Sequence, residues 1–299
     1  MLIVSLLTFA AFSVIPGDVA RTMLGPNATE AQVAALRETL GTDKPLIVQY
    51  ANWLSGLLTF DLGTSTTYNQ PVAALIAQRL PVTLGMSLIA IIMVILISYP
   101  LAILSAKKPG KFLDQVFSVF GHILFAIPPF VMSLLLILLF ANVFKIFSAG
   151  RYVSPSVNFG GFVGCLILPS LAVALPKIAM TFKFMRSEII AQNASEYVKA
   201  SKSHGLSDMR ILIHHVLPNT TVSSVTVITL ALSDILGGSL IVEQVFNLPG
   251  LGRLLLAAVS KRDFPLMSGM VFYLAAITVL LYFISDIISA LADPRIRIK

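Results

Sequence analysis

The most restrictive feature of this chain is a set of long stretches without any charged residue. They are residues 82–106, 115–144, 152–176 and 264–285. A fifth stretch, 219–242, holds a single charge, at Asp234. A helix that crosses the ~30 Å hydrocarbon core of a bilayer needs about 20 apolar residues. Each stretch reaches that length, so the sequence predicts five transmembrane helices.

Composition supports a membrane protein and argues against a soluble one. Only 12% of the 299 residues are charged and 57% are hydrophobic, whereas a soluble domain has about 25% charged residues. The net charge of +7 would suggest nucleic-acid binding in a soluble chain. Here positive loops facing anionic lipid explain it more simply, and we expect no nucleic-acid partner. The single cysteine, Cys165, permits no internal disulfide.

The first 17 residues form a shorter apolar run that we interpret as a sixth span. A secretory signal peptide would begin with basic residues, but no Lys or Arg precedes Arg21. The spans are too long for barrel strands, and an open sheet edge cannot face lipid. We therefore expect one all-α polytopic domain over residues 1–299, with about six transmembrane helices.

Loop charges predict how the spans are oriented. Residues 107–111 and the tail 293–299 carry three cations each, and more lie in 177–218. With six spans these segments share one side, which the positive-inside rule makes cytoplasmic. Both termini are then expected in the cytoplasm, and the loops 18–80 and 244–266 outside.

A polar stretch, SEYVKASKSHGLSDMRILIHHVLPN (195–219), interrupts the apolar chain. Its spacing predicts a helix that ends at Gly205, followed by a second helix capped by Ser207 or Asp208. We expect an apolar face made of Met209, Leu212, Ile213, Val216 and Leu217, and we expect Pro218 to stop the helix. Such a pair of helices could lie on headgroups or present a ridge to a soluble partner. A DNA-binding role is implausible so close to two spans.

These residues resemble the EAA-type cytoplasmic loop of ABC importer permeases. In that family a Gly precedes the Pro of a Leu-Pro by thirteen residues, as Gly205 precedes Pro218 here. Lys199 stands near the motif's acidic position, which is similar to the peptide/nickel branch. Further stretches resemble that branch in family order: IPGD (15–18), LGTS (62–65), FNLPGLGRLL (246–255), KRDFP (261–265) and DPRIR (293–297).

The resemblance implies a type I ABC importer permease of the dipeptide, oligopeptide, nickel, metallophore or opine family, in a bacterial inner membrane. Its implied partners are a second, homologous permease, two cytoplasmic ATPase subunits and an extracytoplasmic solute-binding protein. ATP and Mg would bind to the ATPase subunits, and no cofactor to this chain. Residues 187–218 would form the coupling loop. The residues that would contact the ATPase are Glu196, Tyr197, Lys199, Ala200, Ser201, Lys202, His204, Gly205, Leu206, Met209 and Arg210.

The motifs of enzymes are missing from the sequence. It contains no G-x-x-x-x-G-K-[ST] phosphate loop, no H-E-x-x-H, no C-x-x-C and no G-x-S-x-G. We therefore expect no catalytic residues, and the resemblance implies a transport subunit that works by alternating access. Two alternatives remain: a gradient-driven secondary transporter or channel, and a non-transporting scaffold.

Three residues are candidates for lining a translocation path. A carboxylate inside a span is costly unless paired or wet, so Asp234 either attracts a cationic cargo or bonds to a neighbouring helix. His122 is a second candidate. Gly237 is a third, although Gly237-Gly238 favours close helix packing over selectivity. We expect no metal site at His204, His214 and His215, and a bend at Pro128-Pro129.

The predicted external loop 18–80 contains two helical patterns. Residues 29–41 suggest a helix with Thr29 as N-cap and Gly41 at its C-terminal end. Residues 44–60 are amphipathic, and Trp53 suits a membrane interface. We expect this region to dock the solute-binding protein or, as the simpler alternative, to rest on lipid as a lid.

Overall fold

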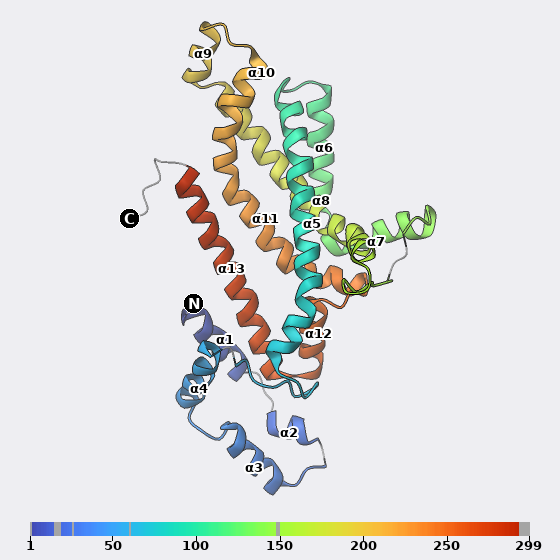
Figure 1. Ribbon diagram of the computed structural model, residues 1–299, viewed down its shortest axis with the longest axis vertical. Helices are drawn as coiled ribbons and strands as arrows, with labels where there is room; N and C mark the ends of the chain where they lie inside the picture. The colour runs from blue at the N-terminus through green and yellow to red at the C-terminus, as the bar shows by residue number, and fades with distance from the viewer. Residues whose placement is uncertain (1, 15–18, 26, 60, 148–149, 293–299) are drawn as a thin grey trace. The chain divides into compact units, whose positions relative to one another are not determined.

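A computed structural model describes residues 2–14, 19–25, 27–59, 61–147 and 150–292. These residues form helices and no strand, apart from one isolated bridge between Thr64 and Pro71. The helices are α1 (Leu2–Val14), α2 (Val19–Leu24), α3 (Glu30–Leu40), α4 (Leu46–Leu58), α5 (Val72–Ala106), α6 (Phe112–Ala126), α7 (Pro129–Ile137), α8 (Phe159–Asn193), α9 (Glu196–Ser203), α10 (Asp208–Ile211), α11 (Leu217–Val245), α12 (Leu251–Lys261) and α13 (Phe264–Ala292), with π-helical turns η1 (Leu138–Val143) and η2 (Leu212–Val216) (Figure 1).

The described residues contain four helices long and apolar enough to span a membrane: α5, α8, α11 and α13. A fifth span arises if α6 and the segment Pro129–Val143 count as one, bent by 104°. The predicted bend at Pro128-Pro129 is thus confirmed. Ile127, the residue before these prolines, is extended, as a residue preceding proline prefers to be. The sixth predicted span is described as a 13-residue helix, α1, and its role as a span stays a prediction.

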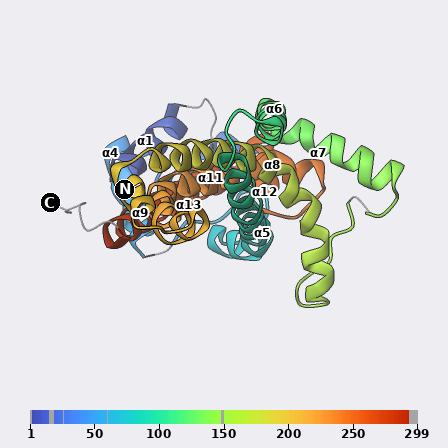
Figure 2. The ribbon, with the colours of Figure 1, turned by 90° about the horizontal axis from the view of Figure 1, so that it is seen from above.

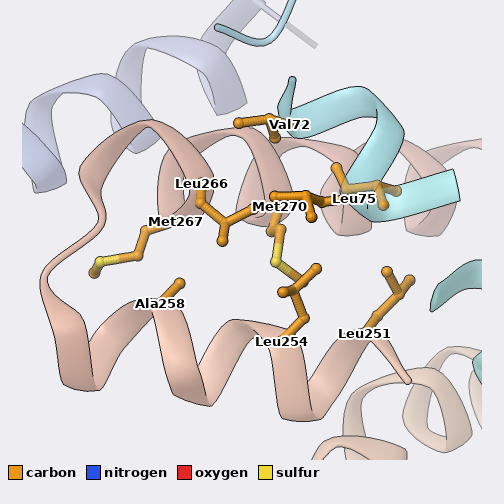
Figure 3. Packing of buried hydrophobic residues seen from close by; sticks show 9 residues of the cluster. Val72, Leu75, Leu251, Leu254, Ala258, Leu266, Met267 and Met270 are labelled. Atoms are coloured by element: carbon orange, nitrogen blue, oxygen red, sulfur yellow. The ribbon is translucent and has the colours of Figure 1, made fainter. Parts of the chain in front are cut away.

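The chain divides into two compact units, of which unit 1 comprises Met1–Thr83 and Pro249–Leu280. Its core joins the start of α5 to α12 and α13 (Figure 3). Val72 and Leu75 meet Leu254 and Met270 there, and all four are buried. The Thr83 hydroxyl accepts a 2.9 Å hydrogen bond from the backbone N–H of Leu251, the first residue of α12. Gly250 at the N-cap has no side chain to cap α12, and this bond helps to fix the start of α12 against α5.

The two helical patterns predicted within 18–80 are confirmed as α3 and α4. The Thr29 side chain and Gln32 form a reciprocal capping box at the start of α3, and Gly41 ends it with φ of 69°. In α4, Trp53 and Tyr50 pack against Phe9 of α1, and Trp53 meets Phe272 of α13 edge to face. Aromatic contacts therefore tie the amphipathic helix to the rest of unit 1.

A buried carboxylate, Asp263, joins two loops of unit 1. It accepts hydrogen bonds from the Ser65 hydroxyl at 2.5 Å and from the backbone N–H groups of Thr67, Thr66 and Leu266 at 3.0–3.2 Å. Burial raises the pKa of Asp263, but these hydrogen bonds outweigh it and hold the pKa below its usual value. The contact joins LGTS (62–65) to KRDFP (261–265), two of the stretches that carry the family resemblance.

Unit 2 comprises Leu84–Leu248 and Leu281–Lys299, and α8 lies at its centre. α8 packs on α6, α7 and α11, and Figure 2 shows α7 turning away from α6. α5 approaches α8 closely at Gly85, where a Cβ would come within 3.0 Å of Leu166. Nearby, the Ser170 hydroxyl donates to the Met86 carbonyl at 3.0 Å. α8 therefore positions α9 and α10, which lie beyond its carboxyl end.

Candidate functional site

The polar stretch forms a helical hairpin, Glu196–Val216, at one end of unit 2 (Figure 1). Gly205 has φ of +77°, a value that L side chains rarely adopt, and it turns the chain from α9 into α10. Ser207 occupies the N-cap position of α10, although its side chain makes no capping hydrogen bond. The predicted break at Gly205 and the start of a second helix are confirmed.

One face of the hairpin is part of a hydrophobic core. Val198 of α9, Ile211 of α10 and Val216 of η2 are each at most 1% exposed. They pack with Ala102 and Ala106 of α5 and with Phe182, Met185 and Ile189 of α8. Because protein cores are close-packed and resist deformation, a displacement of the hairpin would carry the ends of α5 and α8 with it.

The predicted apolar face of the second helix was partly wrong. Leu212 and Val216 are buried as expected, but Met209 and Ile213 are each 49% exposed and Ile211 is buried instead. The prediction assumed a regular α-helical period, whereas residues 212–216 form a π-helical turn. This wider turn shifts which side chains face the core.

The prediction that Pro218 stops the helix was also wrong. Helical structure continues from Asp208 through η2 into α11, and Pro218 lies in the first turn of α11. Proline lacks an N–H and its ring would clash with the carbonyl four residues earlier in a regular helix. The π turn just before it has its own pattern, in which the Leu217 N–H donates to the Leu212 carbonyl. Proline is tolerated in this position because the preceding backbone is already widened.

The other side of the hairpin is charged and exposed. The predicted coupling residues that are exposed are Glu196, Lys199, Ala200, Lys202, His204, Gly205, Met209 and Arg210, while Tyr197, Ser201 and Leu206 are half-buried. Two exposed ion pairs lie here, Lys199–Glu196 at 2.8 Å and Lys202–Asp208 at 3.0 Å. The hairpin therefore combines an anchored inner face with a polar outer face.

A buried ion pair that the sequence did not predict braces the same end of unit 2. Asp114, in the first turn of α6, is 3% exposed and accepts two hydrogen bonds from the Arg186 guanidinium of α8, one of them 2.7 Å long. Ser105 at the end of α5 and the Gly110 N–H donate to the same carboxylate. The sequence signal was an aspartate just after the basic loop 107–111, at the edge of an apolar run.

The path candidates lie on different helices of unit 2. Asp234 of α11 pairs with Lys177 of α8 at 2.7 Å, and their side chains are 56% and 18% exposed. His122 of α6 lines a cavity of about 460 Å³ together with Lys183 and Arg186 of α8. Gly237 is exposed, and a Cβ there would meet nothing within 4 Å. Asp234 thus forms an ion pair with Lys177, whereas His122 lines a cavity whose lining includes neither Asp234 nor Lys177.

Within the part of the chain that the structure describes, no three His, Cys, Asp or Glu side chains lie close enough to share a metal ion. The His214 ring instead contacts the Arg210 carbonyl, with its Nδ1 at 3.2 Å.

A larger cavity, of about 800 Å³, lies in unit 1. Its lining combines aromatic residues, such as Phe9, Trp53 and Phe264, with polar ones, such as Arg37 and Asn52. The cavity therefore offers both apolar area and hydrogen-bonding groups.

Known transport proteins are similar to this chain over nearly its whole length. Residues 98–298 match the family described as binding-protein-dependent transport system inner membrane component, and residues 1–87 match its N-terminal family. A protein of Brucella abortus (strain 2308) that carries the name peptide transport system permease is 35% identical over 297 residues, 99% of this chain and 95% of its own length. The oligopeptide transport system permease protein AppB of Bacillus subtilis (strain 168) is 32% identical over 297 residues, 98% of this chain and 94% of its own.

A solved structure shares the fold. A chain of the inward-facing MetNI methionine ABC transporter aligns with a TM-score of 0.59 and 20% identity, covering 73% of this chain and 96% of that one. The fold is therefore that of a type I ABC importer permease.

Proposed function

The chain belongs to the family of binding-protein-dependent transport system inner membrane components, and from this premise we propose that it is the permease subunit of an ATP-driven peptide importer. Relatives at 31–35% identity over nearly the whole chain carry peptide-transport names. We take peptides as the cargo for that reason, ahead of nickel, metallophores or opines. The family also favours the importer over a gradient-driven transporter and over a scaffold.

The observation that carries this proposal is the two-sided hairpin Glu196–Val216. Its inner face shares a core with α5 and α8, and its outer face is exposed and charged. An ATPase subunit that binds the outer face would move the ends of two spans through the inner face. We propose that ATP binding in two partner ATPases drives alternating access in this way, together with a second, homologous permease.

The remaining partner would act on unit 1. We propose that the solute-binding protein docks outside the cell on the loop region 18–80, at the 800 Å³ cavity that this region lines together with α1 and the start of α13. Both chain termini and the hairpin would then lie in the cytoplasm of a bacterium, as the loop charges predict.

Co-purification tests the coupling site. A tagged chain would be expressed with the subunits of its operon, as wild type, Gly205→Arg or Gly25→Arg. Both glycines have positive φ and open space around the Cβ position, so both variants carry a similar backbone strain of about 1–2 kcal/mol. Only Gly205 lies on the hairpin.

We expect the ATPase subunit to co-purify with wild type and Gly25→Arg, and to be lost or reduced at least tenfold with Gly205→Arg. Equal recovery with both variants would remove the hairpin from the coupling site. If no ATPase binds wild type, the importer proposal itself fails.

A further inference from the structure

The ion pair between Lys177 and Asp234 lies within the membrane-spanning part of unit 2. Asp234 is midway along the candidate span Ser223–Val245, and Lys177 reaches it from α8 across 2.7 Å. A pair between two adjacent helices would ordinarily be explained as a structural contact. Its exposure argues for more than that.

The Asp234 carboxylate is turned outward from this chain. More than half of its side chain, 56%, stays exposed, although the lysine is only 18% exposed. A charged group at the centre of a bilayer is costly and faces the interior of an assembly or water rather than lipid. The exposed side of Asp234 therefore points to a surface that lipid does not occupy, and we take this surface to be the translocation path.

Open space adjoins the carboxylate on the same helix. Gly237 and Gly238 follow Asp234 by three and four residues, so they lie on its face of α11. A Cβ at either glycine would meet nothing within 4 Å. The backbone of α11 is consequently accessible beside the ion pair, and an extended peptide can approach it closely.

The pair is neutral as a whole, which changes the expected cargo. An isolated Asp234 would favour a cation, as the sequence alone suggested. With Lys177 beside it, the site offers one anion and one cation, which match the ammonium and carboxylate groups of a zwitterionic peptide. Each could exchange its partner for a peptide terminus without leaving a buried charge unpaired.

We propose that Lys177 and Asp234 form a binding site for peptide termini on the path surface, where Asp234 holds the amino terminus and Lys177 the carboxyl terminus. The inference rests on the proposed peptide-import function and names two residues that would determine specificity for it. A short peptide would engage both residues at once, and a longer one would engage them in turn.

Carbodiimide coupling tests the site directly, because this water-soluble reagent joins a carboxylate to an adjacent amine. In the assembled transporter without peptide we expect an amide between Asp234 and Lys177, located by mass spectrometry. In a separate sample that contains trialanine, the binding protein and ATP before the reagent is added, peptide adducts on Asp234 or Lys177 should form in place of this link. A sample with the binding protein and ATP but without trialanine is the matched control, in which the Asp234–Lys177 link should still form.

The outcomes decide the proposal. An Asp234–Lys177 link that peptide leaves unchanged, without adducts, assigns the pair a structural role and overturns the inference. Absence of the link without peptide means that the reagent cannot reach the pair, which overturns its place on the path. Wild-type uptake of trialanine, measured in parallel, separates these results from a failure of the importer proposal.

Variants supply an independent readout. Lys177→Met and Asp234→Asn should each lower trialanine uptake about tenfold, the effect of losing one charged hydrogen bond. Lys108→Met, which removes an exposed lysine from the loop between α5 and α6, should leave uptake within about twofold of wild type by the same measure. Equal uptake by all three variants would contradict the site.

Discussion

Among the residues that the structure describes, each of the two units buries one aspartate, and the units hold it in different ways. In unit 2, Asp114 lies against the guanidinium of Arg186 on a neighbouring helix. In unit 1, Asp263 is held by a hydroxyl and three backbone N–H groups. Removal of Arg186 would leave the buried charge of Asp114 with only the neutral donors Ser105 and the Gly110 N–H, which do not balance that charge. A carboxylate that several neutral donors share can lose one of them and keep the rest.

Arg186→Met should cause the largest loss of stability among these variants. It leaves the 3%-exposed Asp114 without its cation, which should destabilise the protein by about 3–5 kcal/mol. The thermal unfolding midpoint of the detergent-purified transporter measures this loss. Lys183→Met, three residues away on α8, serves as the control. A midpoint for Arg186→Met equal to the control's would show that Asp114 does not depend on the arginine.

Asp263→Asn should have the second-largest effect. The amide keeps the shape of the side chain but replaces one acceptor oxygen with a donor, which opposes the N–H groups around it. Loss of hydrogen bonds to a charged group costs about 1.5–3 kcal/mol. Asp61→Asn is a control in the loop that Asp263 contacts, because Asp61 is exposed and accepts a bond from the Gly63 N–H at 2.9 Å. Similar midpoints for both variants would contradict the role of Asp263.

Low pH should have a smaller effect, on the difference in stability between wild type and Asp263→Asn. The folded-state pKa of Asp263 is lowered, so its stabilisation is complete above the unfolded-state pKa of about 3.9 and is lost as the pH falls through the folded value. The gap between wild type and Asp263→Asn should be constant from pH 7 to pH 5 and narrow below about pH 4. A gap that stays constant down to pH 3 would assign the loss to packing instead of charge.

Gly269→Ala should give the smallest effect. A Cβ at this position of α13 would lie 2.9 Å from Val72 and 3.5 Å from Leu62. Because one methyl group of the buried Val72 must move, we expect a loss of about 1 kcal/mol, at the low end for overpacking. Gly164→Ala in α8 meets nothing within 4 Å and should instead gain up to about 1 kcal/mol of helix propensity. Equal midpoints for the two variants would show that unit 1 is looser than the structure indicates.

Local sequence patterns predicted the helices well, but they could not predict contacts between residues far apart in the chain. Uncharged runs located the spans, and Thr29, Gly41 and Gly205 marked helix ends, because these signals act over a few residues. Ser65 and Asp263 are 198 residues apart, and no local pattern connects them. The prediction for Pro218 was wrong for a related reason. Proline usually ends a helix, but the π-helical turn before it removes the conflict, and no residue in 212–216 predicts that turn.

In the candidate site, the family resemblance predicted the coupling hairpin. The ion pairs of Asp234 and Asp114 were found only in the structure. Asp234 was singled out because a charge in an apolar run is conspicuous. Lys177 was not paired with it, because it stood at the end of a different run, 57 residues away. Arg186 and Asp114, 72 residues apart, were missed for the same reason.

The π-helical turn η2 (Leu212–Val216) has a consequence for how this loop can change in evolution. A π turn is an α-helix that has accommodated one additional residue. Deleting a single residue there would restore a regular helix, but it would also rotate everything before it by on the order of 100° about the axis of α11. Ile211 would then leave the core that it shares with α5 and α8. Substitutions on the outer face of the hairpin are therefore compatible with the fold, whereas a one-residue change in length within 212–216 would put the two helices out of phase.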